Sequence, residues 1–281
     1  MSRNQTEKLA FATVALASLV VVLPALVIIG FLAAKGAFAI SWSFLTQMPK
    51  NGMREGGIMP AIVGTLYLVA GTLVFAVPLG VFAAIYLAEY APQSTLRRIV
   101  RLSIVNLAGV PSVVYGLFGY GLFVVTLHFG KSILAGSLTL AFLILPVVIA
   151  ASEEAVRSVP KSFREGSLAL GATRWQTIWR VVLPNAAGGI ITGVVIGVGR
   201  AAGETAPIMF TAAAFFLPKL PSSPLSDCMA LPYHLYVVAS EMFDAPLSMQ
   251  WGTALTLLML VTAMNLVAAL IRARFRRAKC W

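Results

Sequence analysis

Charged residues along the chain occur in short clusters that are separated by long uncharged stretches. The uncharged stretches are 9–34, 56–88, 102–130, 132–152, 181–199 and 245–271. A helix rises about 1.5 Å per residue, so roughly 20 apolar residues cross the ~30 Å hydrocarbon core of a bilayer. Five stretches reach that length and 181–199 is borderline. The pattern predicts an all-α protein with six membrane-spanning helices, because a membrane barrel would show alternating segments of about 10 residues instead.

The first stretch has the position of a secretory signal but not its pattern. Its 26 uncharged residues exceed the apolar core of a signal peptide, which is about 7–15 residues long. No small-residue cleavage site is evident before Lys35. We therefore expect this stretch to be a retained first helix.

Composition agrees with the hydropathy pattern. Of the 281 residues, 59% are hydrophobic and 11% are charged, whereas about a quarter of an ordinary soluble protein is charged. This balance excludes a water-soluble globule.

Basic residues are distributed unequally between the connecting segments. Segments 1–8, 89–101, 153–184 and 272–281 hold 15 of the 21 Lys and Arg residues. Short loops rich in Lys and Arg stay in the cytoplasm, so both termini and these loops are predicted to be cytoplasmic. The net charge of +11 then follows from topology and from anionic lipid at the inner leaflet. Binding of nucleic acid is not expected.

Residues that could form a catalytic or metal centre are sparse. His128 and His234 stand without Cys or carboxylate partners at ligand spacing, so no metal site and no cofactor are predicted. The topology places Cys228 outside and Cys280 inside, which excludes a disulfide between them. Gly130-Lys131-Ser132 has only the end of a phosphate-binding loop. We expect a protein that is not an enzyme and does not hydrolyse ATP by itself.

The predicted cytoplasmic loop 153–184 is long enough for two short helices. The stretch 162–171 ends at Gly171, which suits a helix C-terminus, and Thr173 is an N-cap candidate for the second helix. Chemistry alone favours a surface helix pair anchored in the membrane interface by Trp175 and Trp179.

The same loop resembles the EAA loop of ABC-importer permeases, E-A-A-x3-G-x9-I-x-L-P. The matching positions are Glu165, Gly171, Val181, Leu183 and Pro184, all at the family's spacing. Gly166 and Ser167 stand where the family usually has two alanines, and both are small. The resemblance implies that 153–184 is a coupling loop that docks on an ATP-binding subunit.

A pair of charged residues lies between apolar segments further along the chain. Arg200 and Glu204 are four positions apart, so a helix would bring them together, and Pro207 should end or kink that helix. Charge within a membrane is costly and tends to be functional. An arginine beside free helix-terminal amides suits an oxyanion. An ion pair that only closes a helix interface is the alternative.

Two other patterns in this region have structural interpretations. Gly189, Gly193 and Gly197 recur every four residues, which favours close packing of a second helix. The segment 208–247 contains four prolines between 218 and 232, so it is predicted to be an outer loop rather than a span.

Three strings, 111–117, 154–160 and 199–207, resemble the A-type permeases of phosphate-specific ABC importers. The resemblance implies import of inorganic phosphate, with Arg200 and Glu204 as the intramembrane charged pair. The implied substrate pathway consists of Arg200, Glu204, Thr205, Pro111, Ser112 and Tyr115. For the last three a helix break is an equally good explanation.

This family implies a type I ABC importer permease fold in the cytoplasmic (inner) membrane. Residues 1–281 would form one permease domain, with its core at about 60–271. The implied partners are ABC ATPase subunits, a second homologous permease and a periplasmic or extracellular phosphate-binding protein. Three alternatives stay open: an importer of phosphonate, sulfate or molybdate, a secondary carrier, and a membrane enzyme acting on a phosphorylated lipid.

Overall fold

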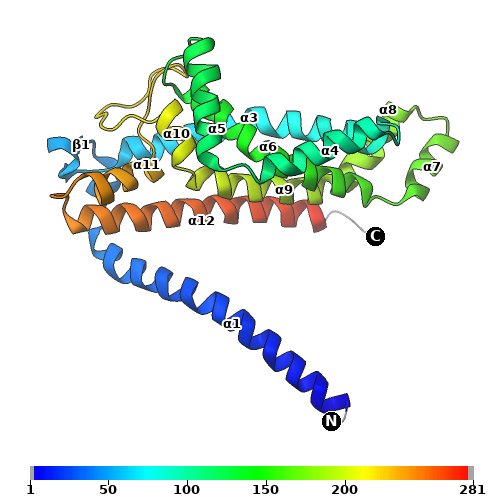
Figure 1. Ribbon diagram of the computed structural model, residues 1–281, viewed down its shortest axis with the longest axis horizontal. Coiled ribbons are helices and arrows are strands. Elements are labelled where there is room, and N and C mark those ends of the chain that lie inside the picture. Colours follow the sequence, from blue (N-terminus) through cyan, green and yellow to red (C-terminus); the bar gives the residue numbers. More distant parts are fainter. Residues whose placement is uncertain (1–2, 278–281) are drawn as a thin grey trace.

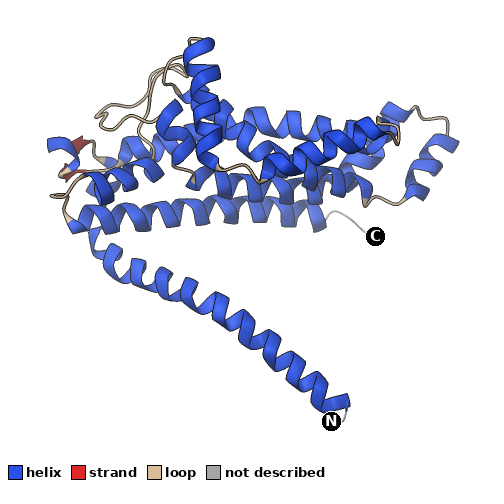
Figure 2. Cartoon of the chain, viewed as in Figure 1, coloured by secondary structure: helices blue, strands red, loops and turns tan. Residues whose placement is uncertain are grey.

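A computed structural model describes the backbone of residues 3–277. The α-helices are α1 (Arg3–Gly36), α2 (Trp42–Thr46), α3 (Met59–Ile85), α4 (Thr95–Ala108), α5 (Ser112–Gly119), α6 (Ile133–Arg157), α7 (Lys161–Ala169), α8 (Arg174–Thr177), α9 (Leu183–Gly203), α10 (Ala206–Thr211), α11 (Leu231–Tyr236) and α12 (Leu247–Arg277). Two short antiparallel strands, β1 (Pro49–Lys50) and β2 (Glu55–Gly56), form a small hairpin near one end (Figure 2).

Short 3-10 and π segments complete the described chain. The 3-10 turns are η1 (Ala37–Ala39) and η2 (Asn51–Met53), and the π segments are η3 (Tyr86–Tyr90), η4 (Tyr120–Thr126), η5 (Ile178–Val182) and η6 (Val237–Glu241). Each π segment extends a helix: η3 follows α3, η4 follows α5, η5 joins α8 to α9, and η6 follows α11.

The centre of the molecule is a bundle in which α6 lies between α3 and α9, and α12 packs on the other side of α9 (Figure 1). Apolar side chains fill these interfaces, among them Leu143, Ile144 and Val148 of α6 and Val198 of α9. Some buried hydroxyls are satisfied by backbone carbonyls, as in the hydrogen bond that Ser137 of α6 donates to the Leu68 carbonyl of α3. The buried hydroxyls of Ser152 on α6 and Thr253 on α12 have no hydrogen-bond partner among the described residues.

The predicted glycine stripe of α9 lies against α6. A Cβ built at Gly189 would stand 2.5 Å from the Cβ of Ala155, and one at Gly193 would stand 2.5 Å from that of Ala151. The absence of side chains at these positions lets the two helix backbones approach closely. Packing is therefore the role of this stripe.

Five helices are long and apolar enough to cross a membrane: Phe11–Ala39, Met59–Tyr90, Ile133–Arg157, Arg174–Gly203 and Leu247–Arg274. The borderline stretch 181–199 belongs to a continuous 30-residue helix, because η5 joins α8 to α9 without a break. A count of six requires that one broken pair of helices be taken as a single span.

That broken pair corrects the prediction of a plain span over 102–130. Thr95–Ala108 and Ser112–Thr126 meet at 103°, and the first of them begins inside the predicted loop 89–101. Pro111 takes an extended conformation (ψ 141°) at the N-cap of α5, and a proline disfavours helical geometry in the residue before it. The chain turns at 109–111 because a helix cannot continue through this proline.

The first helix, α1, leaves the bundle. None of its most apolar window is buried, and it meets α12 only near its own C-terminal end (Figure 1). There Gly36 lies against Leu255 and the Trp251 carbonyl. The first turn of α1 and the last turn of α12 lie toward the end of the molecule that carries α7 and α8 (Figure 1).

The proline-rich segment after α9 forms no long helix, as predicted. It holds α10, α11 and an isolated bridge between Ala213 and Cys228. Cys228 is buried and its thiol is free. Cys280 lies outside the described residues, so the prediction about a disulfide stays a prediction.

Candidate functional site

The charged pair in the apolar part of the chain forms an ion pair. Arg200 Nε lies 3.2 Å from Glu204 Oε1, and the two side chains are 32% and 17% exposed. α9 ends at Gly203, so Glu204 follows the helix in an extended conformation (ψ 129°). The predicted meeting of the two side chains is confirmed, although the carboxylate belongs to the helix end rather than to the helix itself.

The helix break beside this pair is also as predicted. Thr205 separates α9 from α10, and its carbonyl accepts the first hydrogen bond of α10, from the Met209 amide. Pro207 stands in the first turn of α10, where its missing N–H costs nothing. Thr205 and Glu204 therefore form a two-residue interruption between helices in the apolar part of the protein.

The structure brings one predicted residue of α5 to this break. Tyr115 is buried and lies close enough to Arg200 for its hydroxyl to interact electrostatically with the guanidinium. The hydroxyl donates a 2.8 Å hydrogen bond to the Leu107 carbonyl across the α4–α5 bend. Next to it, Gly116 lies against Pro207 and Phe210 of α10.

The other two predicted residues of α5 lie at the bend. Pro111 is exposed and is the N-cap residue of α5, and Ser112 is half-buried in its first turn. For Pro111 the structure therefore provides the helix-break role that was the alternative explanation.

Asn265 of α12 was not found from the sequence. Its amide oxygen lies 3.1 Å from the position that a Cβ at Gly199 would take, and Gly199 directly precedes Arg200 in the chain. Its Oδ1 atom is buried and has no hydrogen-bond partner among the described residues. Asn265 is one of two side-chain amides in the apolar stretch 245–271, and a polar side chain inside such a stretch was the signal that could have revealed it.

The loop after α6 forms the predicted pair of short helices. Gly171 has a φ of +84°, a left-handed conformation that glycine adopts readily, and it ends the α7 turn. Thr173 and Gln176 form a reciprocal capping box at the start of α8. The hydroxyls of Ser167 and Thr177 lie 2.9 Å apart and join the two helices. α6 continues to Arg157 and the next long helix begins at Arg174.

The residues that match the EAA pattern fall in two groups, one on α7 and one at the start of α9. Glu165 and Gly166 are exposed on α7, and a Cβ at Gly166 would meet no atom within 4 Å. Leu168 is 44% and Leu170 is 91% exposed. Leu183 and Pro184 form the start of α9, where the proline again occupies the first turn.

An unpredicted ion pair attaches α7 to the bundle. The Arg164 guanidinium donates to Glu89 Oε1 through Nε at 3.0 Å and through Nη2 at 2.7 Å, and the two side chains are 18% and 16% exposed. The same guanidinium donates to the Val156 carbonyl at the end of α6. Seventy-five positions separate the partners, so spacing along the sequence carried no signal for this contact.

Trp175 and Trp179 support the interfacial interpretation of this helix pair. Their rings meet edge-on with centroids 5.4 Å apart, and they are 57% and 44% exposed. Indole rings favour the membrane–water interface. Surface anchoring by these rings and docking by the exposed leucines use different side chains and are compatible.

Long apolar helices, a charged pair at a helix break and a polar helix pair at one end define a multi-pass membrane transport component. The chain belongs to the family of binding-protein-dependent transport system inner membrane components, whose model matches residues 76–278.

Curated relatives cover most of the chain. It is 37% identical over 257 residues to "Phosphate transport system permease protein PstA 1" of Mycobacterium tuberculosis (strain ATCC 25618 / H37Rv), covering 90% of this chain and 83% of that protein. It is 37% identical over 246 residues to "Probable phosphate transport system permease protein PstA" of Methanocaldococcus jannaschii, covering 88% and 86%.

Solved structures show the same fold at low sequence identity. The chain superposes with a TM-score of 0.64 on a chain of a bacterial ABC transporter involved in the import of alginate, at 15% identity and covering 96% of both chains. The TM-score is 0.61 with an inward-facing MetNI methionine ABC transporter, at 18% identity and covering 78% of this chain and 97% of that one. The fold is that of an ABC importer permease.

Proposed function

We propose that this chain is a permease subunit of an ATP-driven importer that carries inorganic phosphate across the cytoplasmic membrane. The observation that carries the proposal is the Arg200–Glu204 pair at the α9 break, in a chain whose relatives are named as phosphate permeases.

The geometry of the pair suits a transient oxyanion site. Among the described residues Arg200 makes one hydrogen bond, through Nε to Glu204, which leaves its Nη groups as donors. Two parallel N–H groups match the spacing of phosphate oxygens. Glu204 offsets part of the charge, so the site would attract phosphate without holding it permanently. Thr205, Ser112 and Tyr115 complete the proposed pathway, and Pro111 shapes the bend beside it.

Coupling to ATP hydrolysis would take place at the loop within 153–184, at the other end of α9 from the Arg200–Glu204 pair. The exposed surface of α7 supports docking of a separate ATPase subunit, because it presents Leu170 to solvent and keeps small residues at 166 and 167. Closure of two such subunits would move α7. Arg164 would transmit that movement to α3 and α6 through Glu89 and the Val156 carbonyl.

One chain provides one coupling loop, so the pore requires a second, homologous permease. The uncovered apolar surface of α1 supports such a partner. The segment 208–247 at the other end would contact a periplasmic or extracellular phosphate-binding protein. Transport is then alternating access, with no chemistry on the phosphate itself.

Uptake by the reconstituted assembly tests the proposal. We expect ATP-dependent uptake of radiolabelled phosphate, and we expect Arg200→Ala to lower it more than about tenfold, because it removes charge-assisted hydrogen bonds of about 1.5–3 kcal/mol each. The assembly should remain intact. Lys50→Ala is the control, since Lys50 is an exposed cation of β1 that belongs neither to the proposed pathway nor to the segment 208–247.

Three outcomes would contradict the proposal. Loss of the assembly in Arg200→Ala would assign the pair to packing. Uptake by this chain alone, without an ATPase, would indicate a secondary carrier. Equal competition by sulfate, molybdate or phosphonate would keep the importer and change its cargo.

A further inference from the structure

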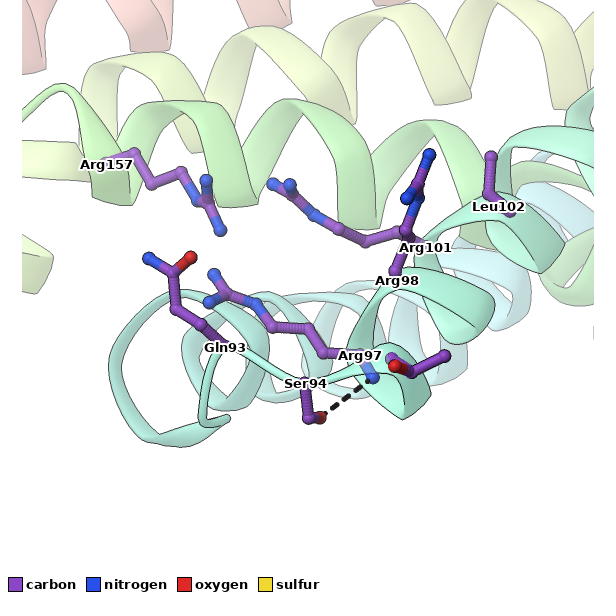
Figure 3. A pocket seen from close by; sticks show the side chains of 8 residues that line it. Gln93, Ser94, Arg97, Arg98, Arg101, Leu102 and Arg157 are labelled. Carbon is purple, nitrogen blue, oxygen red and sulfur yellow. Dashed lines mark hydrogen bonds between the residues drawn. The ribbon is translucent and has the colours of Figure 1, made fainter.

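A pocket lined by arginines lies between the start of α4 and the end of α6 (Figure 3). We call it the α4 pocket; its polar lining comprises Gln93, Ser94, Arg97, Arg98, Arg101 and Arg157. Its volume is 520 Å³, within the range of about 300–1,000 Å³ that is usual for small-molecule sites. The pocket is remote from Arg200 and belongs to the end of the bundle that carries α7 and α8.

Carboxylates do not balance the charge of the α4 pocket. Glu153, whose side chain is 8% exposed, pairs with Arg101 at 2.7 Å and with Arg157 at 3.0 Å. Among the described residues no carboxylate forms an ion pair with Arg97 or Arg98, and Glu89 on the neighbouring wall is engaged by Arg164. Of the four guanidinium groups, two therefore share one carboxylate and two have none among the described residues, which leaves a strong positive potential in the pocket.

Three of these side chains point into one space. The guanidinium groups of Arg97, Arg101 and Arg157 converge beside the Gln93 amide (Figure 3). The Arg97 Nε atom is buried and has no hydrogen-bond partner among the described residues. A buried unpaired donor is costly, and converging like charges repel, so both features favour an anion in the pocket. Guanidinium forks match the oxygens of a phosphate group best.

The helix that carries the arginines presents an apolar face to its surroundings. Leu96 is 70%, Ile99 is 54% and Leu107 is 46% exposed on α4. α4 runs alongside α6, which is long and apolar enough to cross a membrane (Figure 1). The arginines of α4 belong to its first two turns, at the end of the bundle that carries α7 and α8, and basic side chains at the end of a spanning helix lie at headgroup depth. The positive-inside rule assigns this end of the bundle to the cytoplasmic leaflet, where anionic lipids lie.

We infer that the α4 pocket binds a phosphate group at the inner membrane surface, and that the headgroup of an anionic phospholipid supplies it. Free phosphate has the same chemistry and is the other source that the test must separate. This site is distinct from the proposed pathway at Arg200, so the inference holds whichever oxyanion the importer carries.

Retained lipid in the full assembly tests the inference. The assembly is reconstituted in bilayers of phosphatidylglycerol mixed with phosphatidylcholine, and bound lipid is counted by native mass spectrometry after extraction. We expect phosphatidylglycerol to be retained, and Arg97→Gln to weaken its binding about tenfold, because it removes a guanidinium fork from the headgroup phosphate. Arg97→Lys keeps the charge without the fork and should lose less.

Arg180→Gln is the matched control, because Arg180 is an exposed arginine of η5 that does not line the α4 pocket. It should retain lipid like the unmodified chain. Size-exclusion elution of each variant assembly reports on folding, and Arg97→Lys keeps the test valid if Arg97→Gln fails to assemble.

A second arm measures equilibrium binding of radiolabelled phosphate to the same assembly in phosphatidylcholine alone. Binding that Arg97→Gln weakens and Arg180→Gln does not, without a preference for phosphatidylglycerol, would assign the pocket to free phosphate. Equal retention of lipid and of phosphate by Arg97→Gln and Arg180→Gln would overturn the inference. The inference would also be overturned if the chain alone bound lipid and the ATPase subunits abolished that binding, because the pocket would then be a protein interface.

Discussion

Two glycines of the α7–α8 loop illustrate how differently small residues act. Gly171 is required by the backbone, because its φ of +84° strains any other residue. Gly166 has ordinary helical geometry and open space around it. A substitution at Gly171 would therefore disturb this chain itself, whereas one at Gly166 would disturb only a partner that docks there.

We expect Gly166→Trp to leave this chain folded and to weaken co-purification of the ATPase subunit by about tenfold, since a bulky side chain blocks close approach at an interface. Gly121→Trp is the control, because Gly121 also has nothing within 4 Å and belongs to η4. Full retention of the ATPase by Gly166→Trp would show that α7 is not the docking surface.

His234 is a second residue with a testable consequence. It is 1% exposed, neither ring nitrogen has a hydrogen-bond partner among the described residues, and burial lowers its pKa from 6.5 to about 4. Because the unfolded chain binds this proton more readily, stability is complete above about pH 6.5 and is lost as the pH falls toward 4.

Between pH 7.5 and pH 5, this histidine should lower the free energy of unfolding by about 2 kcal/mol. His234→Phe should remove that part of the pH dependence, and the exposed His128→Asn should not. Thermal unfolding of the purified chain in detergent at the two pH values measures the difference. Identical pH profiles for the unmodified chain and His234→Phe would contradict the low pKa.

Among the elements, the contact of α9 with α6 depends most directly on residue size. A Cβ built at Gly193 would stand 2.5 Å from the Ala151 Cβ, whereas one built at Gly188 on the same helix would have nothing within 4 Å. The two positions differ in environment while sharing helix, residue type and sequence neighbourhood.

Gly193→Leu should lower stability by about 1–3 kcal/mol through overpacking, and Gly188→Leu should be close to neutral. The measurement is the unfolding midpoint of each variant in the same detergent. Equal destabilisation by both variants would indicate that helix propensity, rather than the α6 contact, decides the effect.

The α4–α5 bend has a different origin, since a proline rather than a packing contact interrupts the helix. The Tyr115 hydroxyl bonds to the Leu107 carbonyl and thereby satisfies a backbone acceptor beside the break. The bend separates an apolar α5, which is buried at Tyr115, Gly116 and Gly119, from a basic, amphipathic α4 that has no buried residue.

At the scale of the whole molecule, α1 presents an apolar surface that no other part of the described chain covers. Its apolar side chains are exposed along the helix, including Val20 at 64% and Val21 at 74%. A helix surrounded by lipid tolerates this exposure, but an importer pore built from two permeases would cover it.

A photo-reactive residue at Val21 should therefore crosslink the second permease in the full assembly, with a yield several times that from Phe38, which is also exposed but follows the helix. Immunoblotting of the crosslinked product identifies the partner. Crosslinks to lipid alone from Val21 would leave α1 as a membrane anchor and contradict the proposed cover.

Local chemistry explains what the sequence by itself determined. Hydropathy located the apolar helices, Gly171 and Thr173 marked the helix ends in the α7–α8 loop, and a spacing of four predicted the Arg200–Glu204 pair. Each of these features depends on residues within a few positions of one another, so periodicity and capping rules suffice.

Only the tertiary structure decided the rest. It bent the stretch 102–130, joined Arg164 to Glu89 across 75 positions and placed Asn265 beside Gly199. It also brought two arginines of the α4 pocket, Arg101 and Arg157, to Glu153. These contacts join residues on different helices, and their geometry is set by how the helices pack. Distance along the chain carries no information about such pairs, because packing free energy depends on which surfaces meet in space.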